Sequence, residues 1–155
     1  MSKIFFLIPL IWLLGCGNDD EGPTVSEVIT TQPWKVTNFN VQASTLGVQI
    51  PQATIEPFLD DILAQVPLNG TVTFNSDNTF TIDNQGAIIS GTWSLSADES
   101  EITLVLTATS ETFTFTIVEI TANAFTLQFS ITEDVDLQGN TVPVTLDIIA
   151  FLIPA

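Results

Sequence analysis

The chain has 155 residues, and two cationic residues stand against 18 acidic residues, for a formal net charge of −16 at pH 7. This balance excludes nucleic acid as a partner, because Lys and Arg side chains must replace the counterions of the phosphate backbone. The sequence has no histidine, no tyrosine and one cysteine, Cys16, so familiar acid–base and nucleophilic catalysis is poorly supplied. The length suits one domain with an additional segment.

The first 15 residues have the pattern of an export signal. Lys3 precedes an uninterrupted apolar run from Ile4 to Leu14, and Gly15 is a small residue at its end. The run is shorter than the roughly 20 apolar residues of a membrane-spanning helix, so we expect residues 1–15 to be cleaved off. Cleavage removes Lys3 and leaves Lys35 as the cation of the mature chain.

The residues around the cysteine carry a first resemblance. Leu13-Leu14-Gly15-Cys16 resembles the lipobox of bacterial lipoproteins, where cleavage precedes the cysteine and the thiol is acylated. The acidic stretch 18–21 (NDDE) is similar to the tag that carries some Gram-negative lipoproteins to the outer face of the outer membrane. The resemblance implies an outer-membrane anchor of acyl chains, such as palmitate, on Cys16, with the domain at the cell surface. A periplasmic orientation, and an ordinary secretory signal with an incidental cysteine, are the alternatives.

Residues 16–31 are predicted to be the lipidated cysteine and a flexible acidic tether. The stretch GNDDEGPTVSEVITT is polar and has no sustained periodicity. A coil of this length spans about 20 Å, from ~5 to 6 Å multiplied by the square root of the residue number. Residues 32–155 are then predicted to form the folded domain. With Cys16 acylated, no thiol is left for a disulfide, so the core alone holds that domain together.

From Trp34 onward, apolar residues alternate with polar ones, and threonine recurs on the polar face. Short polar turns separate the alternating stretches at intervals of about 8 to 12 residues, which is typical of an antiparallel meander. The predicted strands are 34–41, 71–74, 79–82, 86–95, 101–108, 112–117, 124–131 and 141–152.

The stretch between the first two strands has the period of a helix instead. Its polar residues largely share the opposite face, and Pro57 suits a first turn. The pattern predicts an amphipathic helix of about three turns over residues 54–66, placed as a plug or lid at an open end. The apolar stripe consists of Ile55, Phe58, Leu59, Ile62, Leu63 and Val66; the polar face consists of Glu56, Asp60, Asp61 and Gln65.

These elements predict an all-β fold, an eight-stranded antiparallel meander barrel, because closure removes the edges of the sheet. A two-sheet sandwich is the alternative. The opening PWKVTNF, the hairpin FNSDNTFTI and the later GTWSL resemble the small lipocalin-like domains of bacterial surface and periplasmic lipoproteins, families mostly of unknown function. True lipocalins open with Gly-x-Trp and cover that tryptophan with an arginine. Here Trp34 follows Gln32 and Pro33, and the chain has no arginine.

Aromatic residues on the inward face are the candidate ligand-binding residues. Rings at alternate strand positions line either a pocket for a hydrophobic molecule or a packed core of ordinary density. The candidates are Trp93, Phe113, Phe115, Phe125 and Phe129.

Carboxylates offer weaker candidates. The pairs Asp60/Asp61 and Glu99/Glu101 have the residue type that sugar hydrolysis uses, but their positions indicate a solvated helix face and a turn. Strict alternation points Glu119 inward, where a carboxylate needs a partner, unless it lies at a rim or a bulge. Lys35 is expected on the opposite face from Trp34, as a surface ion-pair partner.

One acidic stretch is similar to the start of a calcium loop. Asp134, Asp136 and Gln138 alternate, and Gly139 follows. The twelfth position, which requires a bidentate Glu in such loops, is Thr145. The default prediction for this stretch is therefore a hairpin turn without a metal.

The sequence thus predicts a lipid-anchored envelope protein without enzymatic activity, cofactor or metal. One hypothesis is a binding module that takes a small hydrophobic ligand into the barrel. The other is a structural or interaction lipoprotein, whose filled barrel is a scaffold for an envelope protein partner.

Overall fold

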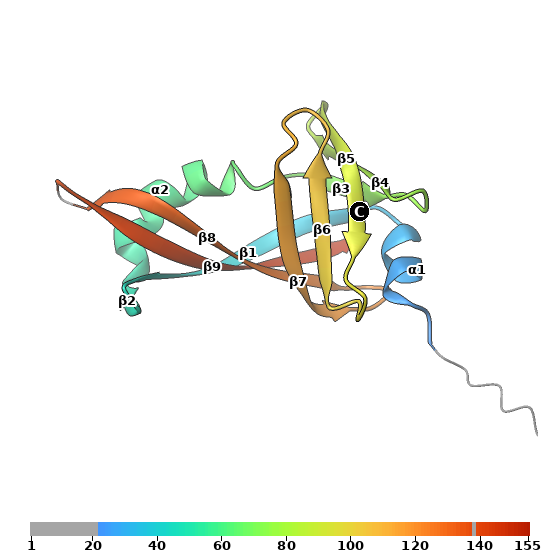
Figure 1. Ribbon diagram of the computed structural model, residues 1–155, viewed down its shortest axis with the longest axis horizontal. Coiled ribbons are helices and arrows are strands. Elements are labelled where there is room, and N and C mark those ends of the chain that lie inside the picture. The colour runs from blue at the N-terminus through green and yellow to red at the C-terminus, as the bar shows by residue number, and fades with distance from the viewer. Residues whose placement is uncertain (1–21, 138) are drawn as a thin grey trace, which may run out of the picture.

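The computed structural model describes residues 22–137 and 139–155 (Figure 1). The predicted signal segment, Cys16 and Gln138 lie outside the described residues. Among the described helices, none is long and apolar enough to span a membrane. The elements in chain order are α1 (Val25–Thr30), β1 (Trp34–Thr45), β2 (Val48–Ile50), α2 (Gln52–Leu63), β3 (Thr71–Phe74), β4 (Thr79–Asn84), β5 (Ala87–Leu95), β6 (Glu101–Leu106), β7 (Thr112–Ile120), β8 (Phe125–Leu137) and β9 (Asn140–Pro154).

The strands form one closed antiparallel sheet. Each strand from β3 to β9 pairs with its neighbour in sequence, and β9 returns to pair with β1. Since β1 also pairs with β3, the ring closes on eight strands, and the short β2 adds a hairpin to the far end of β1. The predicted barrel is confirmed and the sandwich is excluded. All eight predicted strands are present, and β2 is an additional strand that alternation did not predict.

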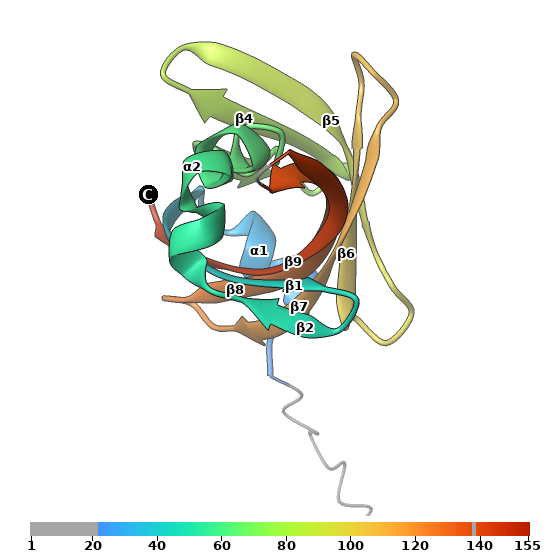
Figure 2. The same ribbon diagram turned by 90° about the vertical axis from the view of Figure 1, so that its left-hand side faces the viewer.

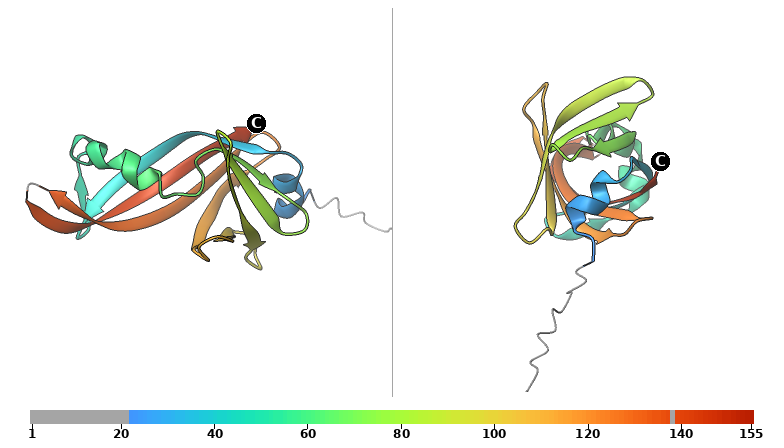
Figure 3. Two further views of the ribbon diagram at one scale, coloured as in Figure 1. Left: turned by 90° about the horizontal axis from the view of Figure 1, so that it is seen from above. Right: turned by 90° about the vertical axis from the view of Figure 1, so that its right-hand side faces the viewer.

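The pairing between β1 and β3 is short compared with the pairings of β9 with β1 and β8. Trp34 and Lys35 pair with Val72 and Thr71, and β1 then separates from β3. Beyond that point β1 continues along β9, and β9 along β8, to form a long curved arm that carries β2 at its tip (Figures 1 and 3). The barrel is therefore open on the side where α2 lies.

Local sequence sets the tight turns. In the β3–β4 turn, the Asp77 carboxylate accepts hydrogen bonds from the backbone N–H and the hydroxyl of Thr79, at 3.0 and 2.6 Å. Asn78 takes a positive φ of 64°, which Asn tolerates better than most residues. The hydrogen bonds to Thr79 lower the pKa of the Asp77 carboxyl. The predicted FNSDNTFTI hairpin is confirmed.

The end of the barrel next to α1, here called the floor, is filled with aromatic rings. Phe74 makes edge contacts with Trp93 and Phe125, at centroid distances of 5.8 and 6.3 Å. Trp34 meets Phe125 edge to face at 5.5 Å, and Phe80 lies 6.4 Å from Phe74. Edge-to-face pairs at such spacings are favourable beyond their buried area. The floor is a packed core.

Helix α1 closes the floor, which corrects the predicted tether. Thr24 begins it with a capping box, in which its hydroxyl accepts from Glu27 N–H and the Glu27 carboxylate accepts from Thr24 N–H. Ile29 is fully buried, and its carbonyl oxygen accepts a hydrogen bond of 3.0 Å from the Trp34 indole. The Glu99 carboxylate accepts from the N–H of Val25 at 3.1 Å. The domain thus begins before residue 32.

Helix α2 covers the open side of the barrel at the other end of the long axis from α1 (Figures 1 and 2). Ile55, Ile62 and Val66 are buried, and the rest of the predicted apolar stripe packs partly buried against the same core. The helix begins at Gln52, so Pro57 lies inside it rather than in its first turn. The predicted amphipathic helix is confirmed, but it begins two residues earlier than predicted and ends at Leu63, three residues before the predicted end.

The buried residues form a single cluster that runs from Ile29 to Leu152. Every strand of the closed ring contributes to it, and both helices cover its ends. Residues 22–155 therefore contain a complete core and folded domain.

Candidate functional site

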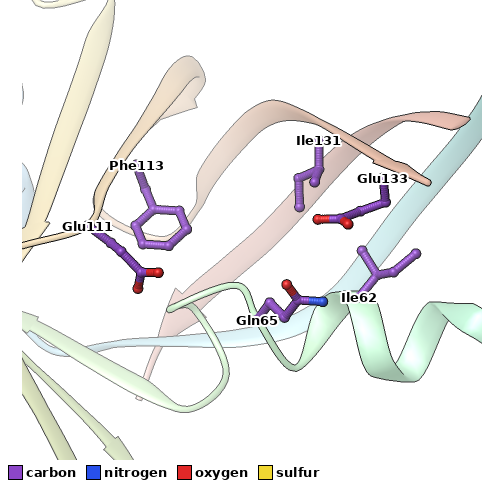
Figure 4. Close-up of a pocket in the computed structure, with 6 residues that line it drawn as sticks. All are labelled: Ile62, Gln65, Glu111, Phe113, Ile131 and Glu133. Atoms are coloured by element: carbon purple, nitrogen blue, oxygen red, sulfur yellow. The ribbon is translucent and has the colours of Figure 1, made fainter. Parts of the chain in front are cut away.

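A pocket of about 330 Å³ lies where the end of α2 approaches β7 and β8 (Figure 4). A volume near 300 Å³ is the lower end of the range for small-molecule sites. We call this space the mouth pocket. Its lining residues are Ile62, Gln65, Glu111, Phe113, Ile131 and Glu133.

Two strand faces and one helix position these side chains. Phe113 belongs to the inward face of β7, which continues to the buried Phe115. Ile131 belongs to the inward face of β8, between Phe129 and the buried Val135. Ile62 comes from the apolar stripe of α2 and is 6% exposed. The mouth pocket therefore has an apolar base formed by three elements.

Polar groups surround this base. Glu133 lies on the same face of β8 as Ile131 and is half-buried. Glu111 precedes β7, two residues before Phe113, and its carboxylate accepts a 2.9 Å hydrogen bond from the Thr109 hydroxyl. In Figure 4 the two carboxylates and the Gln65 amide are directed toward the space between them. An apolar base with a few convergent polar groups is the usual form of a small-molecule site.

The sequence analysis did not predict Glu111, Glu133 or Gln65 as site residues. The signal was present for the two acids, because each continues an alternating apolar face by one further step of two residues. For Gln65 there was no signal, because a polar residue on a helix opposite an apolar stripe normally faces water.

The five aromatic candidates are divided between pocket and core. Phe113 lines the mouth pocket, and it is half-buried. Phe115 and Phe129 pack edge to face at 5.1 Å, below it in the barrel. Trp93 and Phe125 belong to the floor, where the Trp93 indole donates a 3.1 Å hydrogen bond to the Asn75 carbonyl. Sequence alternation identified the correct face but did not separate the rings that pack from the one that borders a space.

The candidate carboxylate pairs lie away from the mouth pocket. Asp60 and Asp61 are exposed on the outer face of α2. Glu101 is exposed at the start of β6, and Glu99 is the residue that binds the N–H of Val25. These pairs form no shared site.

The remaining candidates have structural roles. A register shift between Ile117 and Glu119 turns Glu119 outward, where it is exposed. Of the alternatives for this residue, the structure therefore shows the bulge. Asp136 accepts a 2.6 Å hydrogen bond from the N–H of Gly139 in the β8–β9 turn. Within residues 22–137 and 139–155, no group of three or more acidic, Cys or His residues is arranged to hold a metal ion. Lys35 is exposed on β1, on the opposite face from the buried Trp34, so its predicted position is confirmed.

The closed meander with a helix over its open side defines a lipocalin-like barrel. A family model described as "Lipocalin-like domain (DUF4923)" matches residues 35–139, which is more than half of the chain. The chain belongs to this lipocalin-like domain family. The resemblance to lipocalin-like domains is thereby confirmed.

A solved structure is also similar to this chain. A crystal structure of a DUF4847 family protein from Bacteroides vulgatus is similar to this chain, with 19% sequence identity and a TM-score of 0.41. The match covers 82% of this chain and 96% of that one, and at this TM-score it supports no conclusion about the present protein. No curated protein sequence matches the chain.

Proposed function

We propose that the protein is a lipid-anchored cell-envelope binding protein that takes a small hydrophobic ligand in the mouth pocket. One observation carries the ligand part of the proposal. The space of about 330 Å³ is bordered by Phe113, Ile131 and Ile62, so apolar groups of three elements face one opening. Burying the apolar part of a ligand there is favourable by ~25 cal/mol for each Å² removed from water. The proposal includes no catalytic step and no cofactor.

The anchor part of the proposal rests on the lipobox-like sequence at Cys16. Helix α1 supports a particular arrangement, because it fixes the start of the domain at the floor. Residues 17–23 separate Cys16 from Thr24 in the sequence, and the tether predicted there would span about 15 Å at that length. In this proposal the floor lies near the outer membrane, and α2, toward the other end of the long axis from α1, lies farther from it (Figure 3).

Two variants, one at the end of α2 and one in the turn that follows it, test the ligand part. Gln65 lines the mouth pocket and is exposed, so Gln65→Trp places a large ring in the space without disturbing the core. Asp61→Trp adds the same ring to the outward face of α2 and is the control. With residues 22–155 and octanol as the probe, calorimetry is expected to give weaker binding for Gln65→Trp by about tenfold, near 1.4 kcal/mol. Equal binding by both variants, or none by the wild type, contradicts the proposal.

Lipidation has its own test. The full chain, expressed in a Gram-negative host with a radiolabelled or alkyne-tagged fatty acid, is expected to incorporate label and to fractionate with the outer membrane. Cys16→Ser removes the thiol and is expected to abolish both. Label that persists in this variant contradicts acylation at Cys16.

The filled floor favours a second function, that of a scaffold lipoprotein which binds an envelope protein partner. Ring contacts of 5.1 to 6.4 Å occupy the barrel below the mouth, and a carrier that encloses its ligand needs this space. Crosslinking of the anchored full chain on intact cells distinguishes the two functions. Capture of one defined partner, together with absence of octanol binding, favours the scaffold.

A further inference from the structure

We propose that the ligand of the mouth pocket carries a positive charge, so that the protein selects cationic amphiphiles such as alkylamines over neutral or anionic ones. This inference rests on the proposed function, because it specifies the chemical class of the same ligand. It comes from the combination of an apolar base with two carboxylates that line one cavity.

Both acidic residues line the cavity, and Glu111 lies at its exposed rim. Glu133 stands between Ile131 and the buried Val135 on the inward-facing side of β8, and it is half-buried. Glu111 continues the inward face of β7 beyond Phe113. An inward position in a β-strand normally holds an apolar side chain, because a carboxylate there loses part of its hydration. Glu133 thus places a half-buried negative charge, and Glu111 an exposed one, beside the apolar base of the pocket.

Within the described residues, the protein supplies no cation to these carboxylates. Lys35 is the one Lys or Arg there, and it lies on β1 beside Thr71 and Ile153. That position is at the floor, because the adjacent Trp34 contacts Phe125 and α1. Positive charge near Glu111 and Glu133 must therefore come from a bound molecule or from solvent ions.

The lining of the pocket suits a small molecule with separate apolar and charged parts. Phe113, Ile131 and Ile62 offer contact to a short alkyl chain, while the carboxylates accept hydrogen bonds from an ammonium group. The Gln65 amide oxygen is a further acceptor for the same group. The formal charge of −16 adds a general attraction for cations, and salt screens that attraction.

A matched set of three probes tests the inference. Octylammonium, octanol and octanoate have the same alkyl chain and carry a positive, neutral and negative head. With residues 22–155 at pH 7, calorimetry is expected to show that octylammonium binds about tenfold more tightly than octanol, and octanoate more weakly than octanol. The double variant Glu111→Gln/Glu133→Gln is expected to reduce the preference for octylammonium over octanol to less than about threefold.

The control distinguishes the mouth carboxylates from the overall charge. Glu99 and Glu119 are acidic residues away from the pocket, but Glu99 binds α1, so Glu119→Gln combined with the exposed Asp61→Asn gives the matched change of two charges. This control is expected to keep the preference. If it loses the preference as the mouth variant does, the selectivity comes from net charge and the inference is wrong. If all three probes bind equally, the inference fails while the proposed function stands; if none binds, the proposed function itself fails.

Discussion

Replacement of Trp34 by Phe tests whether one indole fastens α1 to the barrel floor. Trp34 is fully buried, and its N–H donates a 3.0 Å hydrogen bond to the Ile29 carbonyl. Loss of such a bond costs about 1 kcal/mol. The smaller ring leaves about 40 Å² of apolar contact unmade, a further ~1 kcal/mol at 25 cal/mol per Å². We therefore expect Trp34→Phe to lower the free energy of unfolding by about 2 kcal/mol.

The chain offers a matched control for this substitution. Trp93 is also buried in the floor, and its indole likewise donates to a backbone carbonyl, that of Asn75 at 3.1 Å. Trp93→Phe should have a similar effect on stability, because it loses the same kind of bond and ring. It should leave α1 in place, since Asn75 belongs to the β3–β4 turn.

Two measurements separate the variants. Urea unfolding of residues 22–155, followed by circular dichroism, should show midpoints lowered by about 1 M for both variants, from a slope of ~1 to 3 kcal/mol per M. Amide hydrogen exchange should accelerate at Val28 and Thr31 only in Trp34→Phe, because these N–H groups bond within the α1 region. Unchanged exchange of α1 in that variant would refute the idea that the indole fastens the helix.

Three further changes have expected outcomes. Gly91→Ala puts a methyl group against the backbone of β6 and the ring of Phe80, and should lower the free energy of unfolding by about 2 to 3 kcal/mol. An unchanged urea midpoint would show that β5 and β6 move apart there without cost. Hydrogen bonds from two serine hydroxyls lower the pKa of Asp98 from 3.8 to about 2. The contribution of this carboxylate to folding stability is therefore complete above pH 4 and is lost as the pH falls toward 2. Asp98→Asn should remove this pH dependence from the urea midpoints. Thr24→Ala deletes the N-cap of α1 and should cost about 1 kcal/mol, detectable as faster exchange of the Glu27 amide, whose acceptor is the Thr24 hydroxyl.

Alternation was sufficient to predict the sheet because it reports local geometry. From Thr71 to Phe74 and from Thr79 to Ile82, each inward position is apolar and each outward one is polar, so the pairing register follows directly. The same logic failed for β2, whose three residues are too few for a period, and for α1, which is only six residues long. Short elements are formed by their contacts, here Ile29 against the floor, and a sequence pattern cannot show those contacts.

The sequence by itself determined the fold class, the meander order and the amphipathic helix α2, because strand and helix periods are written in the order of residues. It also contained the lipobox-like residues on which the anchor at Cys16 is proposed. Only the tertiary structure decided that Phe113 borders a space while Phe125 packs, and that Glu111, Glu133 and Gln65 converge on it. The physical reason is that a cavity depends on how side chains from separate strands and a helix fill one volume, and this is a property of their three-dimensional arrangement.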